Sequence, residues 1–295
     1  MNNRVQNPLT GVLWMLASGL LFIGVNTTIK SMGDALPAAE GAFLRYVLGL
    51  IFVIPMLKPL RAARLTRVQY KVFFWRGAVH TIGVICWFYA MARIPLADVT
   101  AMNYMVPIYI TIGAAIFLGE KIAKMRIMAV FVALLGALVI LRPGFREISD
   151  GHLAMLGNSF FFASSYLLAK RLSGEVSASV VIAMMSITVT IGLFPFAMIG
   201  WITPTWSQMG YYLLVAFFAT AGHYAMTRAF EVAPVAITQP VTFLSLIWAS
   251  AIGYVFFGEG VDKWVIIGGA IIIAAVSFIT WREALAKRRA RVNHA

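Results

Sequence analysis

Charged residues are scarce in this chain. They make up 12% of its 295 residues, whereas 61% are hydrophobic. An ordinary soluble domain is about half apolar and about a quarter charged. The mean hydropathy of +0.86 reflects long apolar runs, each close to the ~20 residues that a helix needs to cross a bilayer. The composition therefore excludes an ordinary soluble domain and predicts an all-α integral membrane protein.

Several chemical devices are missing. The single cysteine, Cys86, excludes an intrachain disulfide and a thiol cluster for metal. No G-x-x-x-x-G-K-[ST] loop supplies an ATP-binding site, and no His or carboxylate group has metal-ligand spacing. We therefore expect no metal, no cofactor and no enzymatic activity.

Acidic residues are few, and all lie at or just beyond the ends of apolar runs. The eleven are Asp34, Glu40, Asp98, Glu120, Glu147, Asp150, Glu175, Glu231, Glu259, Asp262 and Glu283. Carriers driven by protons or sodium usually hold ionisable residues within their membrane segments. This absence favours facilitated diffusion or exchange, although proton coupling through histidine stays open.

Ten apolar runs are present, and basic residues lie unevenly between them. The predicted spans are near 11–30, 39–57, 72–92, 96–118, 124–142, 151–170, 178–200, 208–230, 235–257 and 264–281. With the N-terminus in the cytoplasm, seventeen of the 24 Lys and Arg residues lie inside and five outside. This positive-inside bias predicts that both termini are cytoplasmic. The net charge of +13 then indicates contact with anionic lipid head groups, not with nucleic acid.

The two halves of the chain resemble each other. Residues 95–122 align with 234–261 at an offset of 139, with Glu120 on Glu259. Residues 11–32 align with 151–172 at an offset of 140, with Phe22 on Phe162 and Lys30 on Lys170. Because five is odd, two tandem five-helix units must enter the membrane from opposite sides. The sequence predicts inverted repeats over 11–144 and 151–283, followed by a basic cytoplasmic tail at 284–295. Such repeats are typical of alternating-access transporters.

Particular motifs carry a family resemblance. The segment "PLADVTAMNYMVPIYITIGAAIFLGE", its partner ending in "FFGE", and "LRPG" at 141–144 resemble the drug/metabolite transporter superfamily, in its branch with two EamA domains. Residues 40–57, 75–77 and 228–240 are most similar to the bacterial inner-membrane carriers that include S-adenosylmethionine and riboflavin transporters. The resemblance implies a carrier of small metabolites and covers nearly the whole chain.

Arg45 and Arg76 are the basic residues inside predicted spans. Arg45 is expected either to capture a substrate carboxylate or to pair with Glu40 or Asp98 as an outer gate. Arg76 is expected either to act in gating or to extend its side chain to the cytoplasmic interface. The Gly-Glu pairs at 119–120 and 258–259 are interpreted as tight-turn devices, with gating as the alternative.

Other polar and aromatic residues within spans complete the candidate site. Histidines can carry a proton or be hydrogen-bonded core residues. Pro107 should kink the fourth span and free the backbone carbonyl of Asn103; the alternative is that Pro107 only shapes helix packing. Pro240 is a second candidate hinge. Small polar residues also help membrane helices pack. The predicted substrate-binding residues are Arg45, Asn26, His80, Trp87, Asn103, Tyr104, Asn158, Tyr166, His223, Gln239 and Trp248, and the predicted gate or hinge residues are Pro107, Glu40, Arg76 and Pro240.

The sequence thus predicts a secondary transporter in a bacterial cytoplasmic membrane, either monomer or homodimer. Its substrate would be a small polar or amphipathic metabolite, such as an amino acid, an S-adenosylmethionine-like molecule or a flavin. The alternatives are an exporter of amino acids or toxic metabolites with the same fold, and a non-transporting accessory protein.

Overall fold

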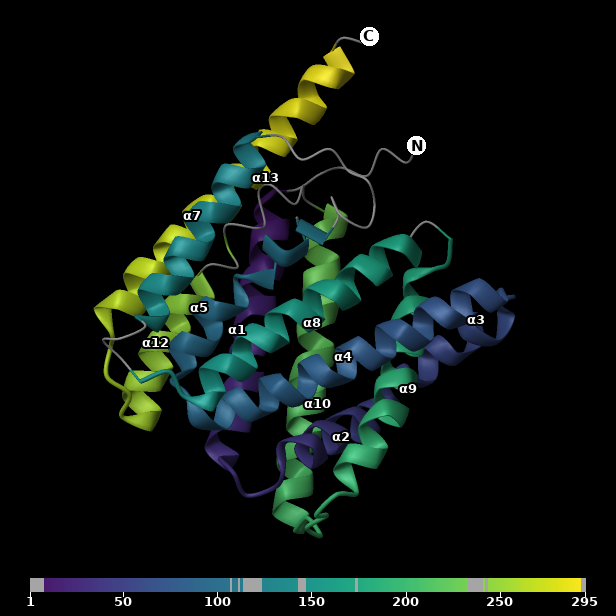
Figure 1. Cartoon of the computed structure of the whole chain (residues 1–295). Helices are drawn as coiled ribbons and strands as arrows, with labels where there is room; N and C mark the ends of the chain where they lie inside the picture. The colour runs from purple at the N-terminus through teal and green to yellow at the C-terminus, as the bar shows by residue number, and fades with distance from the viewer. Residues whose placement is uncertain are drawn as a thin grey trace.

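The computed structural model describes residues 8–106, 108–110, 112–113, 124–142, 147–172, 175–232, 241 and 244–292. Throughout these residues the regular structure is helical (Figure 1). The first half contains α1 (Pro8–Met32), α2 (Ala38–Gly49), the 3-10 helix η1 (Leu50–Met56), α3 (Leu57–Ala62), α4 (Arg67–Arg93), α5 (Leu96–Asn103) and α7 (Lys124–Leu141). The second contains α8 (Asp150–Leu172), α9 (Ala178–Ala197), α10 (Trp206–Val232), α12 (Leu244–Phe257) and α13 (Lys263–Val292).

Four helical segments are long and apolar enough to cross a membrane, by length and composition. They are Leu9–Met32, Ala38–Ala62, Arg67–Arg93 and Ser179–Ala197. Shorter apolar helices occupy Val130–Leu141, Leu244–Phe257 and Lys263–Ala275. The structure therefore supports an all-helical membrane protein, while the number of crossings and the orientation stay predictions.

Local sequence explains two boundaries that differ from expectation. α4 starts at Arg67, five residues before the predicted span, because Thr66 and Gln69 form a capping box: Thr66 Oγ1 accepts from Gln69 N at 3.2 Å, and Gln69 Oε1 accepts from Thr66 N at 2.9 Å. Pro55 cannot donate a backbone hydrogen bond, and the second predicted span becomes 3-10 helical around it before continuing to Ala62.

The fourth predicted span is interrupted near its middle. α5 ends at Asn103, and Tyr104 N and Met105 N bond to carbonyls three residues back, at 3.2 and 3.0 Å. The interruption falls where the proline argument expects a kink. Pro107 itself lies outside the described residues, so its role as a hinge stays a prediction.

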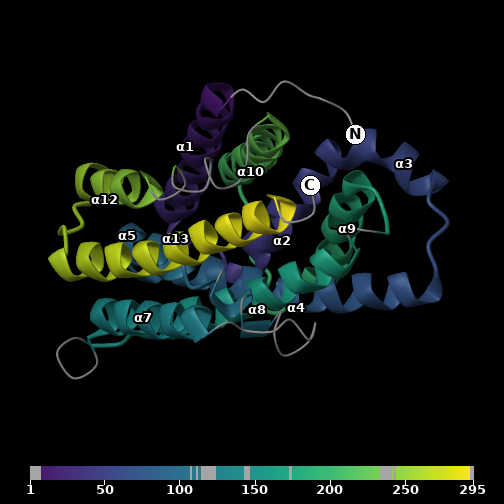
Figure 2. The same ribbon diagram turned by 90° about the horizontal axis from the view of Figure 1, so that it is seen from above.

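The helices pack in pairs that mostly join the two halves. α1 lies along α10, and α4 lies along α8. α2 packs on α9, α5 on α12, and α7 runs beside α13 (Figures 1 and 2). α13 projects from the bundle at its C-terminal end (Figure 1), because the predicted basic tail continues this helix to Val292.

Close glycine contacts repeat between the halves. A Cβ at Gly83 on α4 would lie 2.7 Å from Phe162 of α8, and one at Gly222 on α10 would lie 3.3 Å from Phe22 of α1. Gly222 is the counterpart of Gly83 at an offset of 139, and Phe162 is the counterpart of Phe22 at an offset of 140. The same glycine–phenylalanine contact therefore brings α4 against α8 and α10 against α1.

Candidate functional site

A chain of polar contacts crosses the middle of the bundle. His80 on α4 bonds through Nε2 to the hydroxyl of Tyr46 on α2, and through Nδ1 to the hydroxyl of Ser165 on α8, both at 3.1 Å. Its ring also stacks on Phe162, with ring centroids 4.7 Å apart. Both ring nitrogens are therefore engaged, and His80 holds α2, α4 and α8 together.

Arg45 lies beside this chain on α2. Its guanidinium sits 4.3 Å from the centre of the Tyr46 ring, and its side chain is half-buried. Among the described residues it makes no ion pair or hydrogen bond. Glu40 and Asp98, its predicted partners, have other contacts: Glu40 accepts from Ile202 N at 3.0 Å, and Asp98 contacts His152. The structure therefore does not show Arg45 paired with Glu40 or Asp98 as an outer gate.

Arg76 is buried within α4. It is 5% exposed, and it donates to Val181 O at 3.0 Å and contacts Met185 Sδ at 3.1 Å, both on α9. Its Nε is buried without a partner. The interpretation in which Arg76 extends to the cytoplasmic interface is wrong, because the early start of α4 places this residue more than two turns inside the helix.

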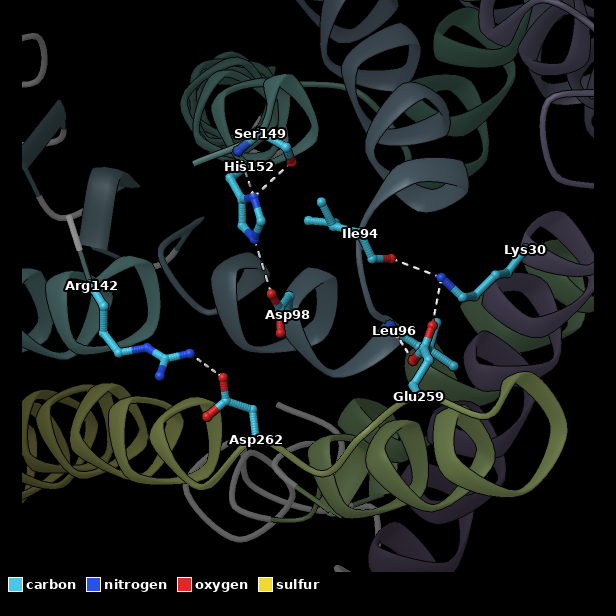
Figure 3. Close-up of polar contacts among 9 residues, drawn as sticks. All are labelled: Lys30, Ile94, Leu96, Asp98, Arg142, Ser149, His152, Glu259 and Asp262. Atoms are coloured by element: carbon cyan, nitrogen blue, oxygen red, sulfur yellow. Dashed lines mark hydrogen bonds and ion pairs between the residues drawn. The ribbon is translucent and has the colours of Figure 1, made fainter. Parts of the chain in front are cut away.

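A second polar region lies at the end of the bundle where α1 and α4 finish, which we call the Glu259 end (Figure 3). Lys30 Nζ lies 2.6 Å from Glu259 Oε1 and donates to Ile94 O at 2.8 Å. Glu259 Oε2 accepts from Leu96 N at 2.9 Å, at the start of α5. One carboxylate therefore joins α1, α5 and the end of α12.

The Gly-Glu pair at 258–259 forms the expected tight turn, and a gating role for Glu259 stays a prediction. Gly258 has a positive φ of 64° at the end of α12, which suits glycine. Glu259 then folds back so closely that a Cβ at Gly253 would overlap its carboxylate. The turn places Glu259 in contact with the first half of the chain. Glu120, its repeat counterpart, lies outside the described residues.

Two further polar pairs join the halves at the Glu259 end. His152 Nε2 on α8 lies 3.0 Å from Asp98 Oδ2 on α5, and both side chains are almost fully buried. Arg142, after α7, contacts Asp262, before α13. A cavity of about 290 Å³ lies between these pairs, lined by Asp98, Arg142, Glu259 and Asp262 among others. Sequence reasoning missed His152 because its repeat counterpart is Val12.

The geometry around His152 indicates its protonation state. Ser149 N donates to His152 Nδ1 at 3.3 Å, and Ser149 Oγ lies 2.8 Å from the same atom. A backbone amide can only donate, so Nδ1 accepts and the ring proton sits on Nε2, facing Asp98. His152 thereby caps the start of α8 in the way that Glu does in a capping box.

The other predicted site residues are spread over several environments. Tyr166, 43% exposed, packs edge-on against Phe162 near His80, and His223 packs edge-on against Phe22. Tyr104 Oη bonds Ser245 Oγ at 2.7 Å, joining the two halves. Asn158 is fully buried beside Met155.

The remaining candidates are less engaged. Asn26 and Trp87 are half-buried, and Asn103 and Trp248 are exposed. Gln239, Pro107 and Pro240 lie outside the described residues. Within the described part of the chain, no group of three His, Cys, Asp or Glu side chains is placed to hold a metal ion.

Curated relatives match nearly end to end. The chain is 30% identical to a riboflavin transporter of Vibrio cholerae, over 97% of this chain and 98% of the relative. It is 27% identical to the pseudopaline exporter CntI of Pseudomonas aeruginosa, over 90% and 94%. It is 25% identical to an S-adenosylmethionine uptake transporter of Rickettsia prowazekii, over 96% of each.

A solved crystal structure shares the fold. It matches with a TM-score of 0.62 at 15% identity and covers 95% of this chain and 97% of that chain. The EamA-like transporter family matches residues 9–142 and again residues 149–281. The chain therefore belongs to the EamA-like transporter family and is a multi-pass membrane transporter of small metabolites.

Proposed function

We propose that this protein is an alternating-access secondary transporter of a bacterial cytoplasmic membrane, built from two inverted five-helix repeats. Its substrate is a small polar or amphipathic metabolite: an amino acid, an S-adenosylmethionine-like molecule or a flavin. Both termini are cytoplasmic, and the Glu259 end faces outside. The basic cytoplasmic segments contact anionic lipid head groups.

The observation that carries this proposal is the exchange of helix contacts between the repeats. α1 packs on α10 as α8 packs on α4, and Phe22 meets Gly222 as Phe162 meets Gly83. A pseudo-two-fold axis between the halves produces this pattern of swapped contacts. Because each repeat has an odd number of membrane helices, that axis lies in the membrane plane. This arrangement lets one cavity open to either side of the membrane.

In this proposal the carrier is closed at its outer end, which three contacts at the Glu259 end support. Lys30–Glu259, Asp98–His152 and Arg142–Asp262 each join one repeat to the other there. Glu40 and Asp98 at this end are 0% and 1% exposed, whereas Tyr166, deeper along α8, is 43% exposed. Opening the outer side must separate these three pairs.

The substrate site is placed at the centre, between the repeats. Arg45 offers five N–H donors and lacks a carboxylate partner among the described residues, so it is available to a substrate carboxylate or to the carbonyl oxygens of a flavin. Tyr166 and Phe162 lie next to His80 and provide aromatic surface for a flat ligand.

Exchange in proteoliposomes tests the proposal. Vesicles containing the full chain are preloaded with unlabelled riboflavin, S-adenosylmethionine or an amino acid, and entry of the labelled compound is followed. A carrier gives faster entry when its substrate is present inside. Arg45→Gln should reduce this stimulation, while Arg61→Gln on exposed α3 should retain it in full. Entry at one rate, whatever the vesicles contain, would reject a carrier.

Export is the second candidate direction, because one similar protein is named an exporter. The same exchange assay detects either direction. The vesicles are then sorted by which end of the protein faces outward. Net flux under an imposed substrate gradient shows whether transport runs preferentially from the cytoplasmic side.

A further inference from the structure

Among the residues that the structure describes, the middle of the bundle carries positive charge without an acidic side chain. Arg45 and Arg76 lie in Ala38–Ala62 and Arg67–Arg93, two segments long and apolar enough to span a membrane. The guanidinium group of arginine is not deprotonated in proteins and therefore keeps its charge. The acidic residues of the sequence fall at or beyond the ends of its predicted spans. The two arginines therefore bring charge to membrane depth that no deep carboxylate can neutralise.

The ion pairs of the described residues do not involve either arginine. Three pairs join Lys30 to Glu259, Arg93 to Asp34 and Arg142 to Asp262, and the neutral ring of His152 donates to Asp98; all of them lie at the Glu259 end. Arg76 instead contacts only a carbonyl and a thioether, with Nε buried and unpaired. A buried charge without a counter-charge is costly and is normally retained for function.

The two arginines act on one place. Both arginines lie beside His80, one on α2 and one on α4. Arg76 and His80 are four residues apart on α4 and so share a face of the helix, and Tyr46 links His80 to the ring on which Arg45 rests. We call Arg45, Arg76 and His80 the basic centre. It contacts α8 and α9 of the second repeat through Ser165 and Val181.

We infer that the basic centre selects substrates with net negative charge, such as carboxylates or phosphate esters, and that their transport is electrogenic. This inference rests on the proposed function. A substrate anion supplies the counter-charge that the protein lacks, and a guanidinium binds either group through two parallel hydrogen bonds. A net cation such as S-adenosylmethionine meets the same two positive charges and is disfavoured, so the inference narrows the proposed substrates to the anionic ones.

The charge of the substrate also sets the direction of flux. The cytoplasmic side of a bacterial membrane is electrically negative, so a carrier that moves a net anion without a compensating ion is driven outward by the membrane potential. The basic centre thus favours the export of anionic metabolites over uptake.

The test uses pairs of solutes that differ in charge but little in shape. Proteoliposomes containing the full chain are assayed for exchange of each solute with itself. The exchange rate of glutamate is compared with that of glutamine, and the rate of riboflavin 5′-phosphate with that of riboflavin. We expect the anionic member of at least one pair to exchange roughly tenfold faster or more, the effect of one charge-assisted hydrogen bond. Equal or faster exchange of the uncharged member in both pairs would overturn the inference.

A potassium gradient with valinomycin then imposes a membrane potential of known sign. For a solute carrying one net charge, a tenfold potassium gradient should give about a tenfold accumulation ratio, into vesicles with a positive interior. Accumulation that ignores the potential would contradict electrogenic transport while leaving the carrier itself established. Exchange of none of the four solutes would reject the proposed function together with this inference.

Charge variants connect the selectivity to the two arginines. Arg45→Gln and Arg76→Gln should each lower the ratio of anion to neutral exchange about tenfold, and Arg45→Lys should preserve most of it because the charge remains. Arg61→Gln is the matched control, exposed on α3. If a variant fails to fold, the wild-type response to the potential still decides the question.

Discussion

The ammonium group of Lys30, two residues before the end of α1, lies 2.6 Å from the carboxylate of Glu259, just after α12. The two residues are 229 positions apart and belong to opposite repeats. Their side chains are only 12% and 14% exposed, and each also bonds backbone next to α5, at Ile94 and Leu96. This pair is therefore shielded from water far better than an ordinary surface ion pair.

Neutralising either partner should favour an open outer end. Lys30→Met or Glu259→Gln leaves a half-shielded charge without its partner, at a cost of about 1–3 kcal/mol to the closed state. We expect severalfold faster reaction of a membrane-impermeant maleimide with Ala97→Cys, which lines the outer cavity, in a Cys86→Ala background.

Asp34→Asn provides the control for that experiment. Its pair with Arg93 lies at the same end but is 60% and 34% exposed and joins residues of one repeat. Loss of such an exposed pair costs at most about 1 kcal/mol and should leave labelling unchanged. Equal labelling in wild type and in both Lys30 and Glu259 variants would show that this pair does not hold the outer end closed.

Removal of His152 should destabilise the protein strongly. His152→Ala removes the hydrogen bond that Nε2 donates to the buried Asp98 carboxylate, at a cost of about 1.5–3 kcal/mol. Asp98→Asn should cost less, since a neutral amide oxygen can still accept from Nε2. Thermal unfolding in detergent gives the ranking, and a smaller loss for His152→Ala than for Asp98→Asn would contradict the pairing.

The repeated glycine contacts predict an asymmetric response. Gly83→Ala places a Cβ 2.7 Å from Phe162, whereas Gly222→Ala places one 3.3 Å from Phe22. Overpacking typically costs about 1–3 kcal/mol, offset by roughly 1 kcal/mol from replacing glycine in a helix. Gly83→Ala should therefore lower the melting temperature, and Gly222→Ala should change it little. Phe162→Leu should partly rescue Gly83→Ala, and failure to do so would place the strain elsewhere.

The sequence predicted the apolar helices well because their signal is local. The start of α9 matches its predicted span, and α1 extends the first predicted span by two or three residues. The doubled segments also matched Phe22 with Phe162, and the structure gives these two residues equivalent glycine contacts; the match of Gly83 with Gly222 was not among the sequence predictions. Boundaries that depend on capping, such as the start of α4 after Thr66, fell outside this reasoning, and the interpretation that Arg76 extends to the interface failed with that boundary.

Contacts between distant residues could not be predicted in the same way. Nothing in the spacing of Lys30 and Glu259 indicates that they meet, because their approach depends on how the two repeats pack. His152 breaks the repeat, so a search for paired motifs passed over it. Burial also escaped the sequence: Asn158 and Asn103 look equally suited to a substrate, yet the first is fully buried and the second exposed.

A reversible cross-link at the outer end tests alternating access most directly. Lys30→Cys with Glu259→Cys, in the Cys86→Ala background, can be joined by a short bifunctional thiol reagent and released by a reductant. Asp34→Cys with Arg93→Cys, within one repeat, is the matched control. The account predicts that the first link stops exchange, that reduction restores it, and that the control link leaves it running. Exchange at the uncross-linked rate with residues 30 and 259 joined would contradict the account.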